Sequence, residues 1–414
     1  MTGPFGSALH SHEYVSDGVA VVPTEAVSDG RLDFTKFPYV TPSKAQALKR
    51  HKLRKGDLIF ARRGAQACGK SALVRDEANG AIAGTGVIVA RVLNQERLDP
   101  EYFAYAAGSP DSVAWLKHHA IGATMPNLNS SVIASLRIPL PDLYEQKKVV
   151  EVLKSIDDKI ELNRRMNQTL ETIARALFKS WFVDFDPVRA KAEGRDTGLP
   201  EHLADLFPDR FVDSELGEIP EGWTEGALED LAVLNPESWS KKAHPCDVDY
   251  VDLSNTKNGV VEQTQEFEWD SAPSRARRVL RKNDTIMGTV RPGNRSYAFI
   301  ASDGLTGSTG FAVLRPKEVF NRYFIYSVAV SEANIERLAH LADGAAYPAV
   351  RPEAVSSTEC VIPNRNVLKA FDDLVDPLRV ACASNEQSSG TLSGLREALL
   401  PKLLSGKLSA MEAA

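Results

Sequence analysis

EQKKVVEVLKSIDDKIELNRRMNQTLETIARALFKSWF, residues 145–182, is the stretch of this 414-residue chain that decides its fold. No Gly or Pro interrupts it, and eight of ten positions spaced alternately four and three apart from Val149 to Trp181 are apolar. This is coiled-coil spacing. Asp142 followed by Glu145 resembles a helix-capping box. A helix of roughly 38 residues is about 57 Å long, too long to be buried in one small domain.

A second copy of this helix is predicted near the C-terminus. Asn385 and four later residues repeat residues of the first helix at an offset of 222, beginning with Asn163. Pro377 and Gly390 interrupt the second copy, so we expect it to be kinked or split. The two helices can bury their seams against each other as an antiparallel pair, although each could instead fold back onto its own domain. In a pair, the polar seam residues Asn163 and Asn385 are expected to lie close together and to fix its register.

The repeat extends over the whole chain. Residues 53–59 (LRKGDLI) correspond to 280–286 (LRKNDTI) at an offset of 227, and 122–128 correspond to 344–350 at an offset of 222. The matches follow one order at nearly one spacing, which is far longer than a solenoid period. Each copy is therefore a whole domain of short strands and helices. The expected strands are 57–61, 81–92, 136–140 and 283–289, and the expected short helices are 100–106 and 321–327.

We therefore predict a mixed α/β (α+β) chain in which two duplicated domains are separated by two long antiparallel coiled-coil helices with pseudo-two-fold symmetry. One difference separates the copies: the second opens with an apolar segment, 228–234, that the first lacks. Either the start of the first copy is truncated or an opening strand is dispensable there. The predicted division is a first domain at 1–140, a central helix at 141–184, a connector at 185–210, a second domain at 211–363 and a C-terminal helical region at 364–414.

The composition is that of a folded protein rather than a disordered one, with 43% hydrophobic and 25% charged residues. No run of about 18 apolar residues occurs, so no membrane span is expected. Residues 1–10 show no basic stretch followed by an apolar one, so no export signal is expected. The four cysteines are scattered without a C-x-x-C motif, which argues against a disulfide scaffold and a zinc site and favours a reducing cytoplasm.

Two basic clusters stand out against the net charge of −6. Residues 50–75 hold eight Lys or Arg against one acid, and 275–295 hold seven against one. They occupy equivalent places in the two copies. Because salt screens distant charges, an anionic ligand interacts with a local cluster rather than with the net charge of the chain. A solvated face is the plain alternative. The candidate DNA-contacting residues are Arg62, Arg63, Lys70, Arg275, Arg277, Arg278, Arg291 and Arg295, with Thr124, Asn127 and Tyr347 as weaker candidates in two turns.

No motif indicates catalysis. Residues 64–71 (GAQACGKS) match the P-loop pattern, but only a short segment follows and the second copy lacks the motif. We interpret them as a β-hairpin loop and keep nucleotide binding through Lys70 as an alternative. Pro141-Asp142 followed by Glu145-Gln146-Lys147 mimics fragments of a nuclease site but is better explained by helix capping. The eight histidines form no ligand spacing, so no metal site is expected.

Several stretches resemble the specificity subunit of type I restriction-modification systems. Two of them look like the helical regions of that family, and two others match short sequence motifs at the starts of its recognition domains. The stretches for the helical regions are 138–185 (IPLP, EQKKV, IDDKIELN and LFKSWFVDF) and 395–407 (LREALLPKLLSGK), and those for the domain starts are 3–7 (GPFGS) and 217–223 (GEIPEGW).

The resemblance implies two target-recognition domains, each reading one half of an asymmetric, bipartite site in double-stranded DNA. It also implies two methyltransferase subunits and restriction subunits as partners, in a cytoplasmic system of DNA methylation and phage defence. S-adenosylmethionine and ATP with magnesium would then be used by the partners, and this chain would bind no cofactor and catalyse nothing. Two other functions stay open: a P-loop nucleotide-binding protein, and a coiled-coil assembly scaffold without DNA contact.

Overall fold

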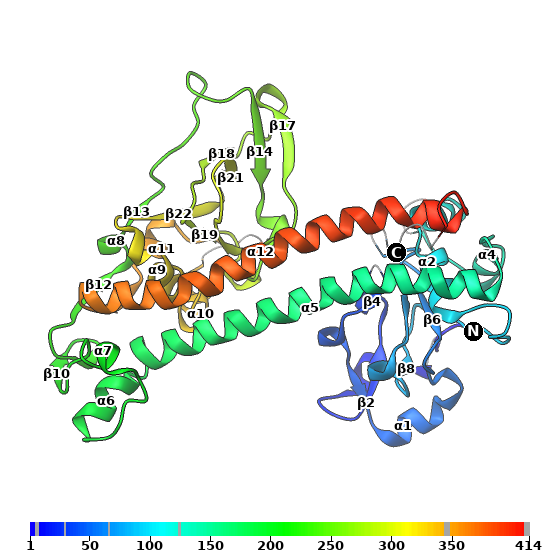
Figure 1. The fold of residues 1–414 in the computed structure, drawn as a ribbon, viewed down its shortest axis with the longest axis horizontal. Coiled ribbons are helices and arrows are strands. Elements are labelled where there is room, and N and C mark those ends of the chain that lie inside the picture. Colours follow the sequence, from blue (N-terminus) through cyan, green and yellow to red (C-terminus); the bar gives the residue numbers. More distant parts are fainter. Residues whose placement is uncertain (5–7, 29, 65–66, 123–125, 343–347, 410–414) are drawn as a thin grey trace. The chain divides into compact units, whose positions relative to one another are not determined.

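The computed structural model describes residues 1–4, 8–28, 30–64, 67–122, 126–342 and 348–409 (Figure 1). The chain forms two compact units, one made of Met1–Leu162 with Ser388–Ala414 and the other of Asn163–Gln387. We call them unit 1 and unit 2 and describe each by itself. Within the described part of the chain, no helix combines the length and the apolar character needed to cross a membrane.

Unit 1 is built around an antiparallel sheet with strand order β7-β6-β9. The central strand β6 (Leu58–Ala61) is wholly buried: Ile59 and Ala61 join one apolar cluster and Leu58 and Phe60 another, because alternate side chains point to opposite faces. The other strands are β1 (Tyr14–Val15), β2 (Val19–Val22), β3 (Val27–Ser28), β4 (Arg31–Leu32), β5 (Tyr39–Val40), β7 (Ser71–Leu73), β8 (Ile82–Ala83) and β9 (Val87–Ala90), and the short helices are α1 (Pro42–Ala47), α2 (Pro100–Ala107), α3 (Pro110–His118) and α4 (Ser130–Ala134).

Unit 2 has two four-stranded sheets, β13-β22-β19-β20 and β17-β14-β21-β18. The expected helix at 321–327 is confirmed as α9, as is that at 100–106 as α2 in unit 1. Both carry aromatic residues into a core: Tyr323 and Phe324 are buried in α9, and Tyr102 is buried in α2. The remaining helices of this unit are short and lie at its connections.

The strands of unit 2 are β10 (Phe211–Ser214), β11 (Gly217–Pro220), β12 (Thr224–Ala227), β13 (Ala232–Leu234), β14 (Asp247–Val251), β15 (Thr256–Lys257), β16 (Val260–Val261), β17 (Gln265–Glu268), β18 (Ala276–Val279), β19 (Thr285–Gly288), β20 (Tyr297–Phe299), β21 (Leu305–Ser308), β22 (Phe311–Pro316) and β23 (Glu359–Ile362). The helices are α6 (Asp186–Ala192), α7 (Glu201–Ala204), α8 (Leu228–Leu231), α9 (Arg322–Ala329), α10 (Glu332–Leu341) and α11 (Pro352–Ser356).

The predicted duplication is confirmed by the pairing of the strands. β6 lies between β7 and β9 as β19 lies between β20 and β22, all antiparallel. β2 and β8 are parallel, as are their counterparts β14 and β21. An isolated bridge joins Arg63 to Asn127 in unit 1 and Val290 to Ala349 in unit 2, at the same two offsets, 227 and 222, that relate the sequences. Both copies thus share one mixed α/β topology.

A buried ion pair recurs at the same place in each copy. Arg91 Nε donates to Asp57 Oδ1 at 2.6 Å, and Arg315 Nε donates to Asp284 Oδ1 at 2.8 Å. Each aspartate also accepts the backbone N–H of the third residue before it, at 2.8 Å. A buried carboxylate is tolerated only when it is paired and hydrogen-bonded. The repeated LRKxD motif is therefore a structural turn, and its aspartate connects β6 to β9 and β19 to β22.

Two 40-residue helices, α5 (Leu143–Phe182) and α12 (Arg365–Leu404), contribute residues to both units. Asp142 begins α5 as predicted, since its Oδ1 accepts the N–H of Glu145 at 2.9 Å. In unit 2 the helices run antiparallel, because Phe178 meets Phe371 while Asn167, earlier in α5, donates to the later carbonyl of Cys382 at 3.1 Å. Both helices are drawn as long ribbons in Figure 1.

The predicted alternative that α12 is split at Pro377 and Gly390 is wrong, because the helix is continuous from Arg365 to Leu404. Proline removes one backbone donor, and glycine costs about 1 kcal/mol of helix propensity. Tertiary packing supplies most of the stability of a helix in a protein and overrides such local costs. Here Phe371, Val375 and Cys382 of α12 are buried.

The strand predicted at 136–140 is also wrong, because these residues form no strand. Their counterpart in unit 2, β23, pairs antiparallel with β12 in the opening segment of the second copy. No described residue of unit 1 takes the place of β12. The backbone of Thr2 bridges Ile88 of β9, and Gly3 N donates to Val87 O at 3.0 Å, so the first residues of the chain line β9 as β13 lines β22. A strand requires a hydrogen-bonded neighbour, which 136–140 lack.

Candidate functional site

Three residues of the basic cluster of unit 1, Arg62, Arg63 and Lys70, lie in the connection between β6 and β7. Arg62 Nε donates to Asn127 Oδ1 at 2.9 Å and to the carbonyl of Leu128 at 3.1 Å. Arg63 is exposed and its backbone bridges Asn127, while Lys70 is half-buried. The structure therefore brings Arg62, Arg63 and Asn127 together from two loops far apart in sequence. Thr124 lies outside the described residues.

The P-loop match in this connection has hairpin geometry. A P-loop binds phosphate at the start of a helix, whereas Ser71, its last residue, begins strand β7 and pairs with Phe60 of β6. Gly69 N donates to the carbonyl of Ala61 at 3.2 Å, which closes the connection. The interpretation as a β-hairpin loop is confirmed. Lys70 is thus followed by a strand and not by the helix whose N-terminus binds phosphate in a P-loop.

In unit 2, Arg291 and Arg295 lie in the equivalent connection, between β19 and β20. They flank a short 3-10 turn, Pro292–Asn294, and both have left-handed backbone angles, with φ of 49° and 60°. Arg291 N donates to the carbonyl of Pro348 at 2.8 Å, and Arg295 forms an ion pair with Glu332. The β19–β20 loop thus contacts the segment at Pro348, as the β6–β7 loop contacts the segment at Asn127 in unit 1. Tyr347 lies outside the described residues.

Arg275, Arg277 and Arg278 lie in or next to β18, a strand of the other sheet of unit 2. Arg275 pairs with Asp252 at 3.2 Å. The guanidinium carbon of Arg277 lies 4.3 Å from the ring centroid of Trp269. Arg278 is half-buried, and burial lowers the pKa of its guanidinium. One cluster in the sequence therefore occupies two different elements of the fold.

Much of the positive charge predicted from the sequence is balanced by acids from other elements. Arg275 meets Asp252, Arg281 meets Glu237 at 3.0 Å, and Arg295 meets Glu332. The partners are 23, 44 and 37 residues away in sequence, so no local pattern could reveal them. Glu237 also pairs with Arg315, and the pKa of its carboxyl is lowered by the hydrogen bonds from Arg281 and Arg315.

Sequence reasoning also missed an aromatic group beside β18. The imidazole of His244 stacks on Trp269 with ring centroids 4.2 Å apart and planes 6° apart. Trp269 lies in a 3-10 turn, Trp269–Ser271, and its backbone N–H donates to the carbonyl of Cys246 at 2.8 Å. A third aromatic residue, Trp239, donates its indole N–H to Thr306 at 3.0 Å. These residues come from separate loops, and their spacing in the sequence has no helical or strand period.

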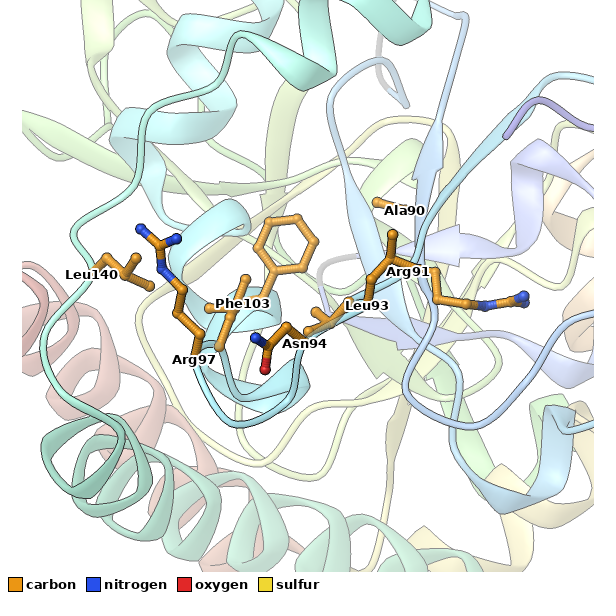
Figure 2. A pocket seen from close by; sticks show the side chains of 9 residues that line it. Ala90, Arg91, Leu93, Asn94, Arg97, Phe103 and Leu140 are labelled. Carbon is orange, nitrogen blue, oxygen red and sulfur yellow. The ribbon is translucent and has the colours of Figure 1, made fainter.

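An open pocket of about 350 Å³ lies in unit 1 beside the end of β9 (Figure 2). Leu93, Phe103 and Leu140 supply much of its apolar lining, and Arg97 lies between Leu140 and Phe103 (Figure 2). The counterpart of Leu93 is Lys317, and that of Phe103 is Phe324. The full lining is Ala90, Arg91, Val92, Leu93, Asn94, Arg97, Leu98, Phe103 and Leu140.

In unit 2 the equivalent surface is covered by its own opening segment. Lys317 N donates to the carbonyl of Leu231 at 2.8 Å, and Leu228 N donates to the carbonyl of Thr358 at 3.1 Å. α8 packs on α9, and Leu228 is fully buried in the same cluster as Phe324. The pocket of unit 1 is thus the uncovered counterpart of a core contact. Its lining offers no arrangement of nucleophile, acid and base.

The two seam asparagines lie next to each other within unit 2. Asn163 Nδ2 lies 3.4 Å from the carbonyl oxygen of Asn385, and Asn385 Nδ2 donates to Asn167 Oδ1 at 2.8 Å. Asn163 is only 1% exposed. These contacts form a polar layer in an otherwise apolar seam, and its role in register stays a prediction. Among the described residues, no group of three or more His, Cys, Asp or Glu side chains could hold a metal ion.

Comparison with known proteins finds that the chain is similar to one family. The family model described as "Type I restriction modification DNA specificity domain" matches residues 30–172. The chain is 27% identical over 335 residues to the HindI specificity subunit of Haemophilus influenzae, covering 69% of this chain and 72% of that protein. It is 25% identical over 335 residues to the MjaIX specificity subunit of Methanocaldococcus jannaschii, covering 78% and 72%.

A solved structure shares the fold. The S subunit of a type I restriction-modification system from M. genitalium has a TM-score of 0.54 and 13% identity, and the match covers 98% of this chain and 92% of that one. At this identity the likeness concerns the fold alone. It matches the arrangement found here, in which duplicated domains are combined with long helices.

Proposed function

Because the chain belongs to the specificity subunits of type I restriction-modification systems, we propose that it selects the DNA site on which such a system acts. The chain is a non-catalytic subunit, as the members of this family are. Its contribution is recognition, so the chemistry of methylation and cleavage belongs to other subunits. The observation that carries the proposal is the duplication, which repeats both the strand pairing and the loop bridges.

Two homologous domains suit a target with two halves. Each domain presents the same loops, so each reads one half-site in duplex DNA. The copies have diverged: residues 1–140 carry 16 Lys or Arg and 12 Asp or Glu, a net +4, whereas residues 211–365 carry 16 and 23, a net −7. The half-sites therefore differ in sequence, and the target is asymmetric and bipartite. In this proposal the long helices set the number of unread base pairs between the halves.

The contacts with DNA are assigned to the basic residues of both copies. Exposed Arg63 and half-buried Lys70 contribute from the β6–β7 connection, and Arg291 contributes from the β19–β20 connection. Most hydrogen bonds between proteins and DNA go to phosphates and sugars, and these position the protein without reading sequence. The remaining candidates of the sequence analysis keep this assignment as proposals: Arg62, Thr124, Asn127, Arg275, Arg277, Arg278, Arg295 and Tyr347.

The partners follow from the same proposal. Two methyltransferase subunits and the restriction subunits assemble with this chain in the cytoplasm, and they use S-adenosylmethionine and ATP with magnesium. This chain itself binds no cofactor. Similarity to named specificity subunits supports this assignment. The P-loop alternative is disfavoured, because Ser71 lies in a strand. The scaffold alternative predicts no retention of DNA.

Methylome sequencing of cells that express this chain with its methyltransferase subunit tests the proposal. The expected result is one asymmetric motif with two short specified halves and a fixed gap. A continuous motif, or no methylation that depends on this chain, would overturn the proposal. A binding assay with the same complex separates the scaffold alternative, because contacts with phosphates make affinity fall steeply with salt.

A further inference from the structure

Arg277 is the extra residue of a β-bulge in unit 2. Along the β18–β21 pair, Ala276 lies opposite Ser308 and Arg278 lies opposite Gly307, so Arg277 has no residue of its own on the partner strand. The carbonyl of Arg277 instead accepts the backbone N–H of Trp239 at 2.8 Å. Bulges redirect a side chain out of the regular alternation and are frequent beside functional sites.

The redirected side chain rests on an aromatic platform. Its guanidinium carbon lies 4.3 Å from the centroid of the Trp269 ring, and the imidazole of His244 stacks on the same indole at 4.2 Å. Trp269 is itself buried, with 9% of its surface exposed. A cation held over an indole gains cation–π energy. Because the planar guanidinium is already oriented, less side-chain entropy is lost when it binds a ligand.

Arg277 also keeps its charge available. Its described contacts include one hydrogen bond, from Nη1 to the carbonyl of Ala276 at 3.2 Å, and no carboxylate. Three other arginines of the same cluster are each paired with an acid: Arg275, Arg281 and Arg295. A guanidinium has five N–H donors in a rigid fork, so several donors of Arg277 remain for a ligand.

The adjacent arginine is arranged differently. Arg278 is half-buried, and its Nη1 donates to the hydroxyl of Ser238 at 3.3 Å. Its backbone also bridges Ser238, which links β18 to the segment after β13. Arg278 is therefore held by its contacts with Ser238, whereas Arg277 contacts the Trp269 ring and, among its described contacts, no carboxylate. The two residues of the Arg277–Arg278 dipeptide consequently have separate roles.

We propose that Arg277 is a specificity-determining residue that reads a guanine in the half-site of unit 2. In this assignment its fork donates to O6 and N7 of that guanine in the major groove, the commonest sequence-specific contact of arginine. The inference rests on the proposed function, since it needs duplex DNA as the ligand. It goes further by separating one base-reading arginine from neighbours that are paired with acids.

The test is selection of bound duplexes from a random DNA pool by the complex of this chain with its methyltransferase subunits. Wild type, Arg277→Ala and Arg277→Lys are compared, with Arg281→Ala as the matched control because Arg281 is an exposed arginine of the same cluster paired with Glu237. Arg277→Ala is expected to lose the preference for guanine at one position of one half-site, by roughly 10- to 100-fold, and to leave the other positions unchanged.

Arg277→Lys should lose most of the same preference while keeping the charge, because an ammonium cannot make the two parallel hydrogen bonds. Arg281→Ala should select the wild-type motif. If both Arg277 variants select the wild-type motif with uniformly weaker binding, Arg277 is a phosphate contact and the inference is wrong, while the proposed function stands. If wild type itself selects no motif, the proposed function fails first. Selection of an intact half-site for unit 1 by each variant shows that the complex has assembled.

Discussion

Asn163 Nδ2 lies 3.4 Å from the carbonyl oxygen of Asn385, the residue that occupies in α12 the place of Asn163 in α5. The pair therefore marks where the two copies of the helix cross each other in equivalent positions. Asn385 in turn donates to Asn167 Oδ1 at 2.8 Å, one helical turn further along α5. A buried polar layer of this kind penalises any shifted register, because the shift would separate the amides from their partners.

Replacing Asn163 by Leu is expected to preserve or raise the melting temperature. The leucine fills an apolar seam position and removes the cost of burying an amide, while register becomes less strictly specified. Calorimetry measures the first effect. Distances between spin labels on the two recognition domains measure the second, and their distribution should broaden. A marked loss of stability in Asn163→Leu would show that the amide acts chiefly as a stabilising hydrogen bond.

Arg62 and Arg63 are adjacent, but their alanine variants should behave differently. Arg62→Ala removes the hydrogen bonds to Asn127 and Leu128, so we expect a loss of about 1–3 kcal/mol of stability. Arg63→Ala should leave the melting temperature unchanged and lower the slope of log affinity against log salt by about one. Thermal unfolding and DNA binding over a range of salt concentrations test the pair. Equal melting temperatures for the two variants would contradict the structural role of Arg62.

His51 should make unit 1 less stable at acidic pH. The ring is 4% exposed, accepts a hydrogen bond from Arg50 Nε at 2.9 Å and lies 3.1 Å from the carbonyl of Thr2, an arrangement that suits the neutral ring. Burial, with the adjacent Arg50 charge, lowers the pKa of His51 below its usual 6.5. The stabilisation is thus complete above pH 6.5 and is lost as the pH falls through the lowered value.

The measurement is the free energy of unfolding between pH 5 and pH 8, for wild type and for His51→Gln, which cannot be protonated. The difference between the two should shrink as the pH falls. A difference that stays constant across this range would mean that the ring is not held in its neutral form.

Covering the pocket of unit 1 should stabilise the chain. A copy of residues 221–234 fused directly before Met1 keeps the strand register. Thr2, which pairs with Ile88, corresponds to the residue two positions after Leu234 in unit 2, so Met1 alone must separate the copied Leu234 from Thr2. The copies of Leu228 and Leu231 would be buried on Phe103 and Leu93, which predicts a rise of about 2–6 °C in melting temperature. The control graft carries serine at the copies of Leu228 and Leu231. Equal melting temperatures for both grafts would show that the pocket does not accept the segment.

Deleting one heptad from each of α5 and α12 should shorten the gap in the recognised DNA. The rise of seven helical residues is about 10.5 Å, which corresponds to about three base pairs. Methylome sequencing reads the gap directly. Deleting seven residues from α12 alone serves as the control, because it breaks the antiparallel register and should abolish recognition. A gap that ignores the length of both helices would show that they do not set the spacing.

Sequence periodicity was sufficient for the features that are local or repeated. The apolar positions from Val149 to Trp181 predicted a long helix, and the structure has α5 over Leu143–Phe182. The repeated motifs predicted the duplication, whose strand pairs follow the same offsets. Predictions from local residue preferences were wrong where contacts with other elements determine the structure. Pro377 and Gly390 lie inside a continuous α12, and residues 136–140 form no strand.

The candidate site likewise has features that the sequence predicted and features that it could not predict. Counting charges located both basic clusters, because composition alone sets the charge of a segment. It could not show that Asp252 balances Arg275 or that Trp269 holds Arg277, since these partners come from other elements. The sequence by itself therefore determined the duplicated architecture and the length of α5, because a periodic pattern is one-dimensional. Only the tertiary structure decided which arginines keep an unbalanced charge, because that depends on which distant side chains the fold brings within a few ångströms.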